Sequence, residues 1–202
     1  MLLLLGGPAR KFKAVHVVGT NGKGSTASTL ASILKESGCR TALYTSPHLV
    51  SFGERLQIGG EEVPPHKWED VLSVIKTALD SSKRLKADPT TYFDLITAAA
   101  FMIIADEAAD LPVVEAGLGG RLDATNILSG VILTLITPIG IDHSEYLGST
   151  RASVAKEKFA VMRPCVPAIF SGGDGEVETI FFDTAFKKNT PTQVLRRLCG
   201  YG

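Results

Sequence analysis

The sequence lacks the features that mark several large classes of protein. Its three cysteines, Cys39, Cys165 and Cys199, are widely spaced and form no C-x-x-C pair, so neither a disulfide framework nor a zinc cage is indicated. Basic and acidic residues balance at 21 each, which leaves no positive surplus to hold DNA or RNA. No stretch reaches the roughly 18 uninterrupted apolar residues of a membrane-spanning helix. We therefore expect a cytoplasmic protein that binds neither nucleic acid nor membrane.

What is present is the pattern of a globular α/β domain. Hydrophobic residues make up 45% of the chain, and 20 glycines and 10 prolines punctuate it. Helical periodicity follows a first turn as far as Gly38, begins again at Pro65 and at Thr91, and recurs after Thr150. Between these segments lie short apolar runs, predicted to be strands, at 15–18, 41–44, 111–114, 131–136 and 166–170. The alternation predicts a three-layer αβα domain with a mostly parallel sheet.

A glycine-rich turn separates the first strand from the first helix. The segment Gly19–Thr26 carries three glycines, one lysine and two hydroxyl residues. Its amides can converge on an anion, Lys23 can reach terminal phosphates, and Ser25 or Thr26 can ligate magnesium. The segment departs from G-x-x-x-x-G-K-[ST], since Val17 stands four positions before Asn21 and Gly24 follows the lysine, so it is a variant. A glycine turn without a ligand is the alternative interpretation.

Polar segments follow several strands at their carboxyl ends, where ligands bind in open parallel sheets. Beyond the glycine-rich turn these are Ser46–His48, Glu115–Gly120 and Asp142–His143. Glu115 can reach a nucleotide-bound magnesium or polarise a water, although a surface glutamate would give the same pattern. His143 is either a metal ligand or a structural histidine. The candidate site is therefore expected at this edge of the sheet.

Three further features have both a functional and an ordinary interpretation. The loop Gly119–Asn126 combines backbone amides with Arg121 and Asp123, a set that suits binding of an anionic substrate or a phosphate. The alternative interpretation is a solvated loop. Glu54–Arg55 is an exposed ion pair or a substrate contact. Lys158 shares the apolar face of its helix, so it either extends to solvent or is buried with a low pKa and is chemically modified.

Taken together, these motifs resemble the folylpolyglutamate synthase/dihydrofolate synthase family, a branch of the Mur ligase superfamily. The resemblance runs from about Leu5 to about Pro164. It rests on GTNGKGS at Gly19–Ser25, TSPHL at Thr45–Leu49, Glu54–Arg55, TYFDLITAAAF at Thr91–Phe101, GLGGRLDATN at Gly117–Asn126, and IGIDHSEYLG with AKEK within Ile139–Lys158.

The resemblance implies an ADP-forming amide ligase that uses ATP and Mg²⁺. ATP would phosphorylate the carboxylate of a folate or dihydropteroate, and the amine of L-glutamate would then displace phosphate. Lys158 matches the family's carbamylated lysine, and the implied catalytic residues are Lys23, Glu115, His143 and Lys158. The implied magnesium ligands are Ser25, Ser46, Glu115 and His143. The implied nucleotide-binding residues are Gly19, Thr20, Asn21, Gly22, Lys23, Gly24, Ser25, Thr26 and Asn126.

The family pattern also contains parts that this sequence does not match. The family has a longer N-terminal helix and a C-terminal α/β domain that helps bind nucleotide and glutamate, and a small Ala-Gly pair where this chain has Phe159–Ala160. We therefore expect residues 1–202 to form a Mur ligase-like ATP-binding domain, incomplete at both ends and without the C-terminal glutamate-ligase domain. Such a chain is expected to be a monomer with weak or absent ligase activity.

Three other functions stay open at this point. A peptidoglycan Mur ligase uses the same acyl-phosphate chemistry, but the GLGGRLDATN and TSPHL segments favour the folate branch. A nucleotide-binding module without catalysis would bind ATP without glutamate-dependent release of ADP. A P-loop kinase or GTPase fits the variant turn and the glycine loop after Glu115 less well.

Overall fold

The computed structural model describes residues 5–82 and 90–195 of the chain. These residues form an eight-stranded sheet in the order β4-β3-β2-β5-β1-β6-β7-β8, in which β3 runs antiparallel to its two neighbours, β2 and β4, and all other neighbouring strands are parallel. The strands are β1 (Ala14–Val18), β2 (Thr41–Tyr44), β3 (Leu56–Ile58), β4 (Glu61–Glu62), β5 (Leu111–Glu115), β6 (Val131–Ile136), β7 (Ala168–Phe170) and β8 (Thr192–Val194).

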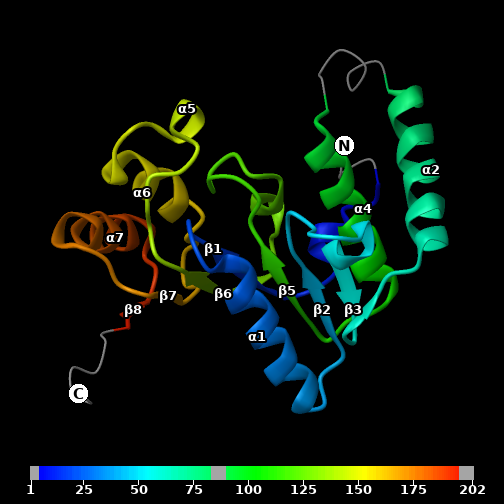
Figure 1. Ribbon diagram of the computed structural model, residues 1–202, viewed down its shortest axis with the longest axis horizontal. Helices are drawn as coiled ribbons and strands as arrows, with labels where there is room; N and C mark the ends of the chain where they lie inside the picture. Colours follow the sequence, from blue (N-terminus) through cyan, green and yellow to red (C-terminus); the bar gives the residue numbers. More distant parts are fainter. Residues whose placement is uncertain (1–4, 83–89, 196–202) are drawn as a thin grey trace.

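Helices cover both faces of this sheet, which confirms the predicted three-layer αβα architecture (Figure 1). The helices are α1 (Lys23–Glu36), α2 (Pro65–Ser81), α4 (Tyr92–Asp106), α5 (Ser144–Leu147), α6 (Arg151–Phe159) and α7 (Gly175–Lys188). Successive side chains of a strand point to opposite faces. On β1, Val15 and Val17 therefore pack under α1, whereas Ala14 belongs to the cluster that α2 and α4 cover.

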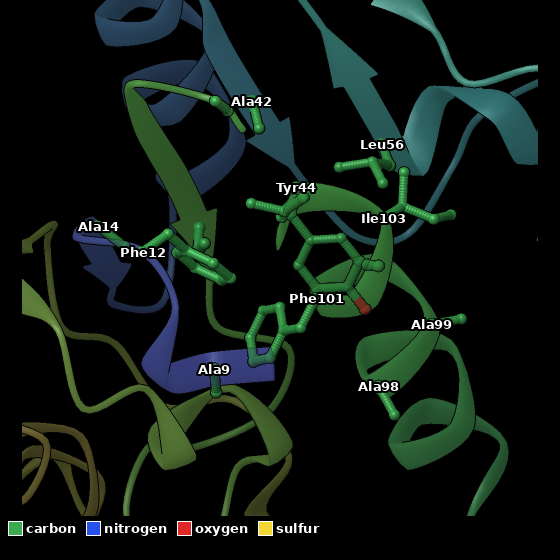
Figure 2. Close-up of a cluster of buried hydrophobic side chains, with 14 of the residues drawn as sticks. Ala9, Phe12, Ala14, Ala42, Tyr44, Leu56, Ala98, Ala99, Phe101 and Ile103 are labelled. Atoms are coloured by element: carbon green, nitrogen blue, oxygen red, sulfur yellow. The ribbon is translucent and has the colours of Figure 1, made fainter. Parts of the chain in front are cut away.

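The larger hydrophobic cluster lies under α2 and α4, and Figure 2 shows its centre. The Phe101 ring packs edge-on against Phe12 and Tyr44, with centroid distances of 5.8 and 6.3 Å. Helix α4 presents the fully buried residues Ala98 and Ala99 to the same cluster. Small side chains let this helix approach the sheet closely, so α4 fixes the strand ends beside it.

A second cluster lies at the opposite end of the sheet, where α6 and α7 pack against each other over β6 and β7 (Figure 1). Its centre is a trio of buried phenylalanines, Phe159, Phe170 and Phe181, with ring centroids 5.1 to 5.4 Å apart. Phe159 comes from α6, Phe170 from β7 and Phe181 from α7. Tight packing of this kind holds α6 in one position relative to the sheet.

Most of the predicted elements are confirmed, with differences at particular places. The strands predicted at 41–44 and 131–136 have these bounds, whereas β7 begins only at Ala168. The pair β3 and β4, helix α7 and strand β8 were not predicted. The helical periodicity that begins at Thr91 predicts an apolar face that includes Tyr92, but Tyr92 is 60% exposed, because it lies in the first turn with its ring 6.0 Å from the guanidinium carbon of Arg55.

Two predictions about chemistry outside the site can also be examined. Cys39 and Cys165 are free thiols, and Cys199 lies outside the described residues. Within residues 5–82 and 90–195, every helix is too short or too polar to cross a bilayer.

Candidate functional site

The glycine-rich turn lies between the end of β1 and the start of α1, as predicted. Gly22 precedes the helix with φ of +80°, and no side chain caps the first turn of α1. The amides at the start of a helix have no carbonyl four residues earlier to bind, so they are available to an anion. The backbone N–H of Thr20 donates to Pro138 O (3.0 Å), and its hydroxyl binds Gly140 O (3.1 Å). The loop after β6 therefore holds one side of the turn.

Lys23, Ser46 and Glu115 come together at the mouth of this turn. The Glu115 side chain is 5% exposed, its Oε1 lies 4.0 Å from Lys23 Nζ, and its Oε2 accepts the backbone N–H of Ser46 (3.1 Å). Burial raises the pKa of Glu115, and the Ser46 amide and the Lys23 charge partly oppose that rise. The alternative of a surface glutamate is thus excluded: the carboxylate is enclosed between two neighbouring loops and one cation.

The four residues predicted as magnesium ligands offer an incomplete donor set. They include one carboxylate, and within the described part of the chain no group of three or more His, Cys, Asp or Glu side chains could hold a metal ion. Mg²⁺ is usually bound by one or two carboxylates, with waters and phosphate oxygens completing the octahedron. Glu115 beside the phosphate turn fits that mode of binding, whereas a site made of protein ligands alone does not fit.

Lys158 is buried, which excludes the interpretation that its side chain extends to solvent; its modification stays a prediction. The residue is 3% exposed, and its Nζ donates to Gly19 O at 2.7 Å. Burial, and then the charge of Lys23, lower its pKa from 10.5 to about 8. The following Phe159 packs into the second hydrophobic cluster, while the Lys158 amine reaches the phosphate turn. The bulky ring therefore packs away from the amine.

A cavity of about 620 Å³ opens at the same edge of the sheet. Its lining includes Ser46 and His143, together with Arg55, which is 9% exposed and donates from Nε to His48 Nδ1 (2.8 Å). The His143 side chain is 53% exposed and lies 3.5 Å from Asp142. The carboxylate of Glu54 accepts the backbone N–H groups of residues 49 to 51. Of the two interpretations of Glu54–Arg55, the exposed ion pair is wrong, because the two side chains make separate contacts, and Arg55 lines the cavity.

The glycine loop that begins at Gly117 forms one wall of this cavity, down to Ala124. Asp123 is 8% exposed, and its Oδ2 accepts the backbone N–H of Leu118 (2.7 Å), so its carboxylate closes the loop from within. Asn126, predicted to bind nucleotide, uses both ends of its amide: Nδ2 donates to Arg121 O (3.0 Å) and Oδ1 accepts from Arg163 (3.0 Å). Its nucleotide role stays a prediction.

Some residues of the site were not among the predicted site residues. Thr91, Phe93 and Asp94 line the cavity, although the sequence analysis used their segment only as a helix and as part of the family resemblance. Their position at the first turn of α4, facing a strand end, depends on tertiary packing. His16, buried in β1 and bonded to Thr125, was also missed. A polar residue inside an apolar strand was the available signal.

Curated relatives of known name cover nearly the whole chain, whereas no protein-family profile matches it. The chain is 33% identical over 200 residues to the dihydrofolate synthase/folylpolyglutamate synthase of Bacillus subtilis, which covers 98% of this chain and 46% of the relative. It is 37% identical over 177 residues to the enzyme of the same name from Escherichia coli, and the match covers 88% of this chain and 40% of the relative. The chain thus spans a little less than half the length of these relatives.

Solved structures agree in fold over the same portion. An FPGS–AMPPCP complex superimposes with a TM-score of 0.92 at 30% identity, covering 97% of this chain and 48% of the other. E. coli FolC in complex with DHPP and ADP gives a TM-score of 0.86 at 34% identity, and the match covers 95% of this chain and 44% of FolC. Both resemble this chain over about half of their own length.

Proposed function

The chain belongs to the folylpolyglutamate synthase/dihydrofolate synthase family, and we propose that it takes part in ATP-dependent ligation of glutamate. The similarity covers a little less than half the length of its relatives. The proposed reaction is the ADP-forming ligation of L-glutamate to the carboxylate of a folate or dihydropteroate. The observation that carries the proposal is the buried Glu115 carboxylate, held by Lys23 and the Ser46 amide beside a phosphate-binding turn.

The proposed reaction has two steps. A carboxylate oxygen of the pteroate attacks the γ-phosphorus of ATP, and ADP leaves with the electron pair of the broken bond. The glutamate amine then attacks the acyl carbonyl, phosphate leaves, and the amine loses its proton. The turn and Lys23 would hold the phosphates and offset the charge that develops on them. Complexes of relatives with AMPPCP, with folate and with DHPP support these ligand classes.

The remaining site residues take their proposed roles from position. Magnesium would neutralise phosphate charge when bound. Ser25, Ser46, Glu115 and His143 would hold it, of which Ser46 contacts Glu115 and shares the cavity with His143. A buried lysine with a pKa of about 8 has a substantial neutral fraction at pH 7 to 8, and a neutral amine can add to CO₂. This supports carbamylation of Lys158.

We further propose that residues 1–202 form one ATP-binding domain that works as a monomer in the cytoplasm. The described residues support the single domain because one continuous sheet runs through them from β4 to β8. Size-exclusion chromatography with light scattering tests the monomer.

The proposal is tested with the purified chain in two stages. Binding of AMPPCP with magnesium is measured by calorimetry, and incorporation of labelled glutamate is then assayed with ATP and either dihydropteroate or tetrahydrofolate. Lys23→Ala removes the cation beside Glu115 and should weaken nucleotide binding about tenfold to a hundredfold, since hydrogen bonds to charged groups contribute about 1.5–3 kcal/mol. Lys35→Ala, at an exposed lysine near the other end of α1, is the matched control.

Each outcome separates the alternatives. Product that disappears in Lys23→Ala establishes glutamate ligation by this chain. Nucleotide binding without product favours a nucleotide-binding module. Failure to bind AMPPCP, or equal effects of the two lysine variants, contradicts the proposed phosphate site.

A further inference from the structure

His16 is a buried polar residue in the middle of the sheet. It occupies the third position of β1, whose five residues are all buried, and is itself fully buried. Its Nε2 lies 2.8 Å from the hydroxyl of Thr125, a residue 109 positions later in the chain. Its Nδ1 has no hydrogen-bond partner among the described residues. A buried polar side chain with this single contact calls for an explanation.

The direction of the hydrogen bonds follows from Asp123. Its Oδ1 accepts both the backbone N–H of Thr125 (2.9 Å) and the Thr125 hydroxyl, and its Oδ2 accepts the N–H of Leu118 (2.7 Å). Burial raises the pKa of Asp123, whereas the hydrogen bonds from Thr125 and Leu118 oppose that rise. Because each oxygen accepts a backbone N–H, the geometry favours the ionised carboxylate, which takes the only hydroxyl proton of Thr125. His16 must then donate from Nε2. This tautomer leaves Nδ1 bare, which agrees with its lack of a partner.

These bonds connect the central strand to the wall of the cavity. The Asp123 carboxylate accepts the backbone N–H of Leu118 at one end of the glycine loop and that of Thr125 at the other. Residues 117 to 124 of this loop line the cavity. The loop has little apolar anchorage of its own, since Leu122 is 81% exposed. Its shape therefore depends on where the Asp123 carboxylate is held.

We propose that His16 and Thr125 are positioning residues, which fix the substrate-facing loop 117–124 through a directed hydrogen-bond chain from His16 Nε2 to Thr125 Oγ1 to Asp123 Oδ1. This inference rests on the proposed function for the identity of the ligand, a pteroate-type molecule in the cavity. These hydrogen bonds reach the cavity wall from the side of the sheet, and none of them involves a residue of the phosphate turn. Their loss should therefore weaken pteroate binding and spare nucleotide binding.

The first experiment compares two variants of Thr125. Thr125→Val keeps the size of the side chain but removes the hydroxyl, whereas Thr125→Ser retains the hydroxyl and removes the methyl group. We expect Thr125→Val to bind dihydropteroate at least about tenfold more weakly, Thr125→Ser to bind within about threefold of the unchanged chain, and AMPPCP affinity to change less than threefold in both. His16→Leu and His16→Gln form a second pair, because glutamine can place an amide N–H near the position of Nε2.

The matched control is Thr134→Val. Thr134 pairs with His16 in the sheet register, and its buried hydroxyl has no hydrogen-bond partner among the described residues. Removing that hydroxyl should leave dihydropteroate binding unchanged. The proposal is overturned if Thr125→Val binds dihydropteroate normally, if Thr125→Ser is as weak as Thr125→Val, or if nucleotide and dihydropteroate affinities fall together.

A second experiment needs no ligand and so separates failure of this inference from failure of the proposed function. Long-range ¹H–¹⁵N spectra of histidine should show His16 protonated at Nε2 and bare at Nδ1 at neutral pH. Amide exchange at Leu118 should accelerate about tenfold or more in Thr125→Val and return to normal in Thr125→Ser. Protonation at Nδ1, or unchanged exchange at Leu118, would overturn the chain of hydrogen bonds even if dihydropteroate never binds.

Discussion

Replacing the buried Lys158 by methionine should stabilise the protein near neutral pH. The lysine is 3% exposed, and its amine contacts the backbone oxygen of Gly19. Holding an ammonium group in this position opposes folding, as the lowered pKa records. Methionine fills a similar volume and carries no charge. Buffers free of CO₂ are needed, because a carbamylated lysine would be an anion.

The magnitude follows from the two pKa values. The difference between 10.5 in the unfolded chain and about 8 in the folded one corresponds to about 3 kcal/mol. Methionine leaves the Gly19 carbonyl without its donor, which costs about 1–3 kcal/mol. The expected net effect of Lys158→Met at pH 7 is a gain of about 1 kcal/mol in the free energy of unfolding.

The pH dependence gives the stronger test. Between pH 8 and 10.5 the unfolded chain binds the proton that the folded chain has lost, so the stability of the unchanged protein rises with pH relative to the variant. The advantage of methionine should be complete well below pH 8, shrink by about 1.4 kcal/mol per pH unit above it, and reverse near pH 9. Urea unfolding at pH 7, 8, 9 and 10 measures this, with Lys156→Met, at an exposed lysine of the same helix, as the control. A stability difference that stays constant from pH 7 to pH 10 would refute a buried ammonium.

Three further substitutions test the packing around the site. A Cβ at Gly19, whose φ is +146°, would lie 1.9 Å from Thr137 Oγ1. Gly19→Ala should therefore lower the free energy of unfolding in urea by about 1–3 kcal/mol and weaken AMPPCP binding in calorimetry. Normal AMPPCP binding by this variant would contradict the prediction. Tyr44→Phe removes a 2.9 Å hydrogen bond to Thr97 and should cost about 1 kcal/mol, seen as a lower urea midpoint with an unchanged slope. Phe159→Ala empties the centre of the second cluster and should cost about 3–5 kcal/mol in chemical unfolding, whereas a cost below 1 kcal/mol would mean that the cluster is not tightly packed.

The parts of the fold that could be predicted are those with a local cause. The buried parallel strand at 131–136 is a mostly apolar run rich in β-branched residues, the strand at 41–44 is a short run that follows the glycine at the end of a helix, and the turn at Gly19–Gly24 has its own glycine pattern. Strands β3 and β4 have only three and two residues, and they exist because β3 pairs with β2 and β4 pairs with β3. Helix α7 exposes Phe182 and Phe186, which blurs the apolar periodicity from which a helix is predicted.

The site divides in the same way. The phosphate turn, Glu115 and the unusual place of Lys158 could be recognised from the sequence, because each depends on its immediate neighbours. The contact of His16 with Thr125 spans 109 residues, and that of Lys158 with Gly19 spans 139. Neither contact leaves a periodic trace, so only the packed structure brings these residues together.

The end of helix α6 connects the two loops that the proposed reaction needs. Its Glu157 carbonyl accepts the backbone N–H of Arg121 (3.1 Å), and a Cβ at Gly120 would lie 2.7 Å from that same oxygen, so the cavity loop can rest here only with glycine. One residue later, Lys158 binds the carbonyl of Gly19 in the phosphate turn. The phenylalanine cluster holds this helix end rigidly against the sheet. The distance between the phosphate turn and the cavity wall is therefore set by α6, and a change in either loop must be accommodated at these two consecutive residues.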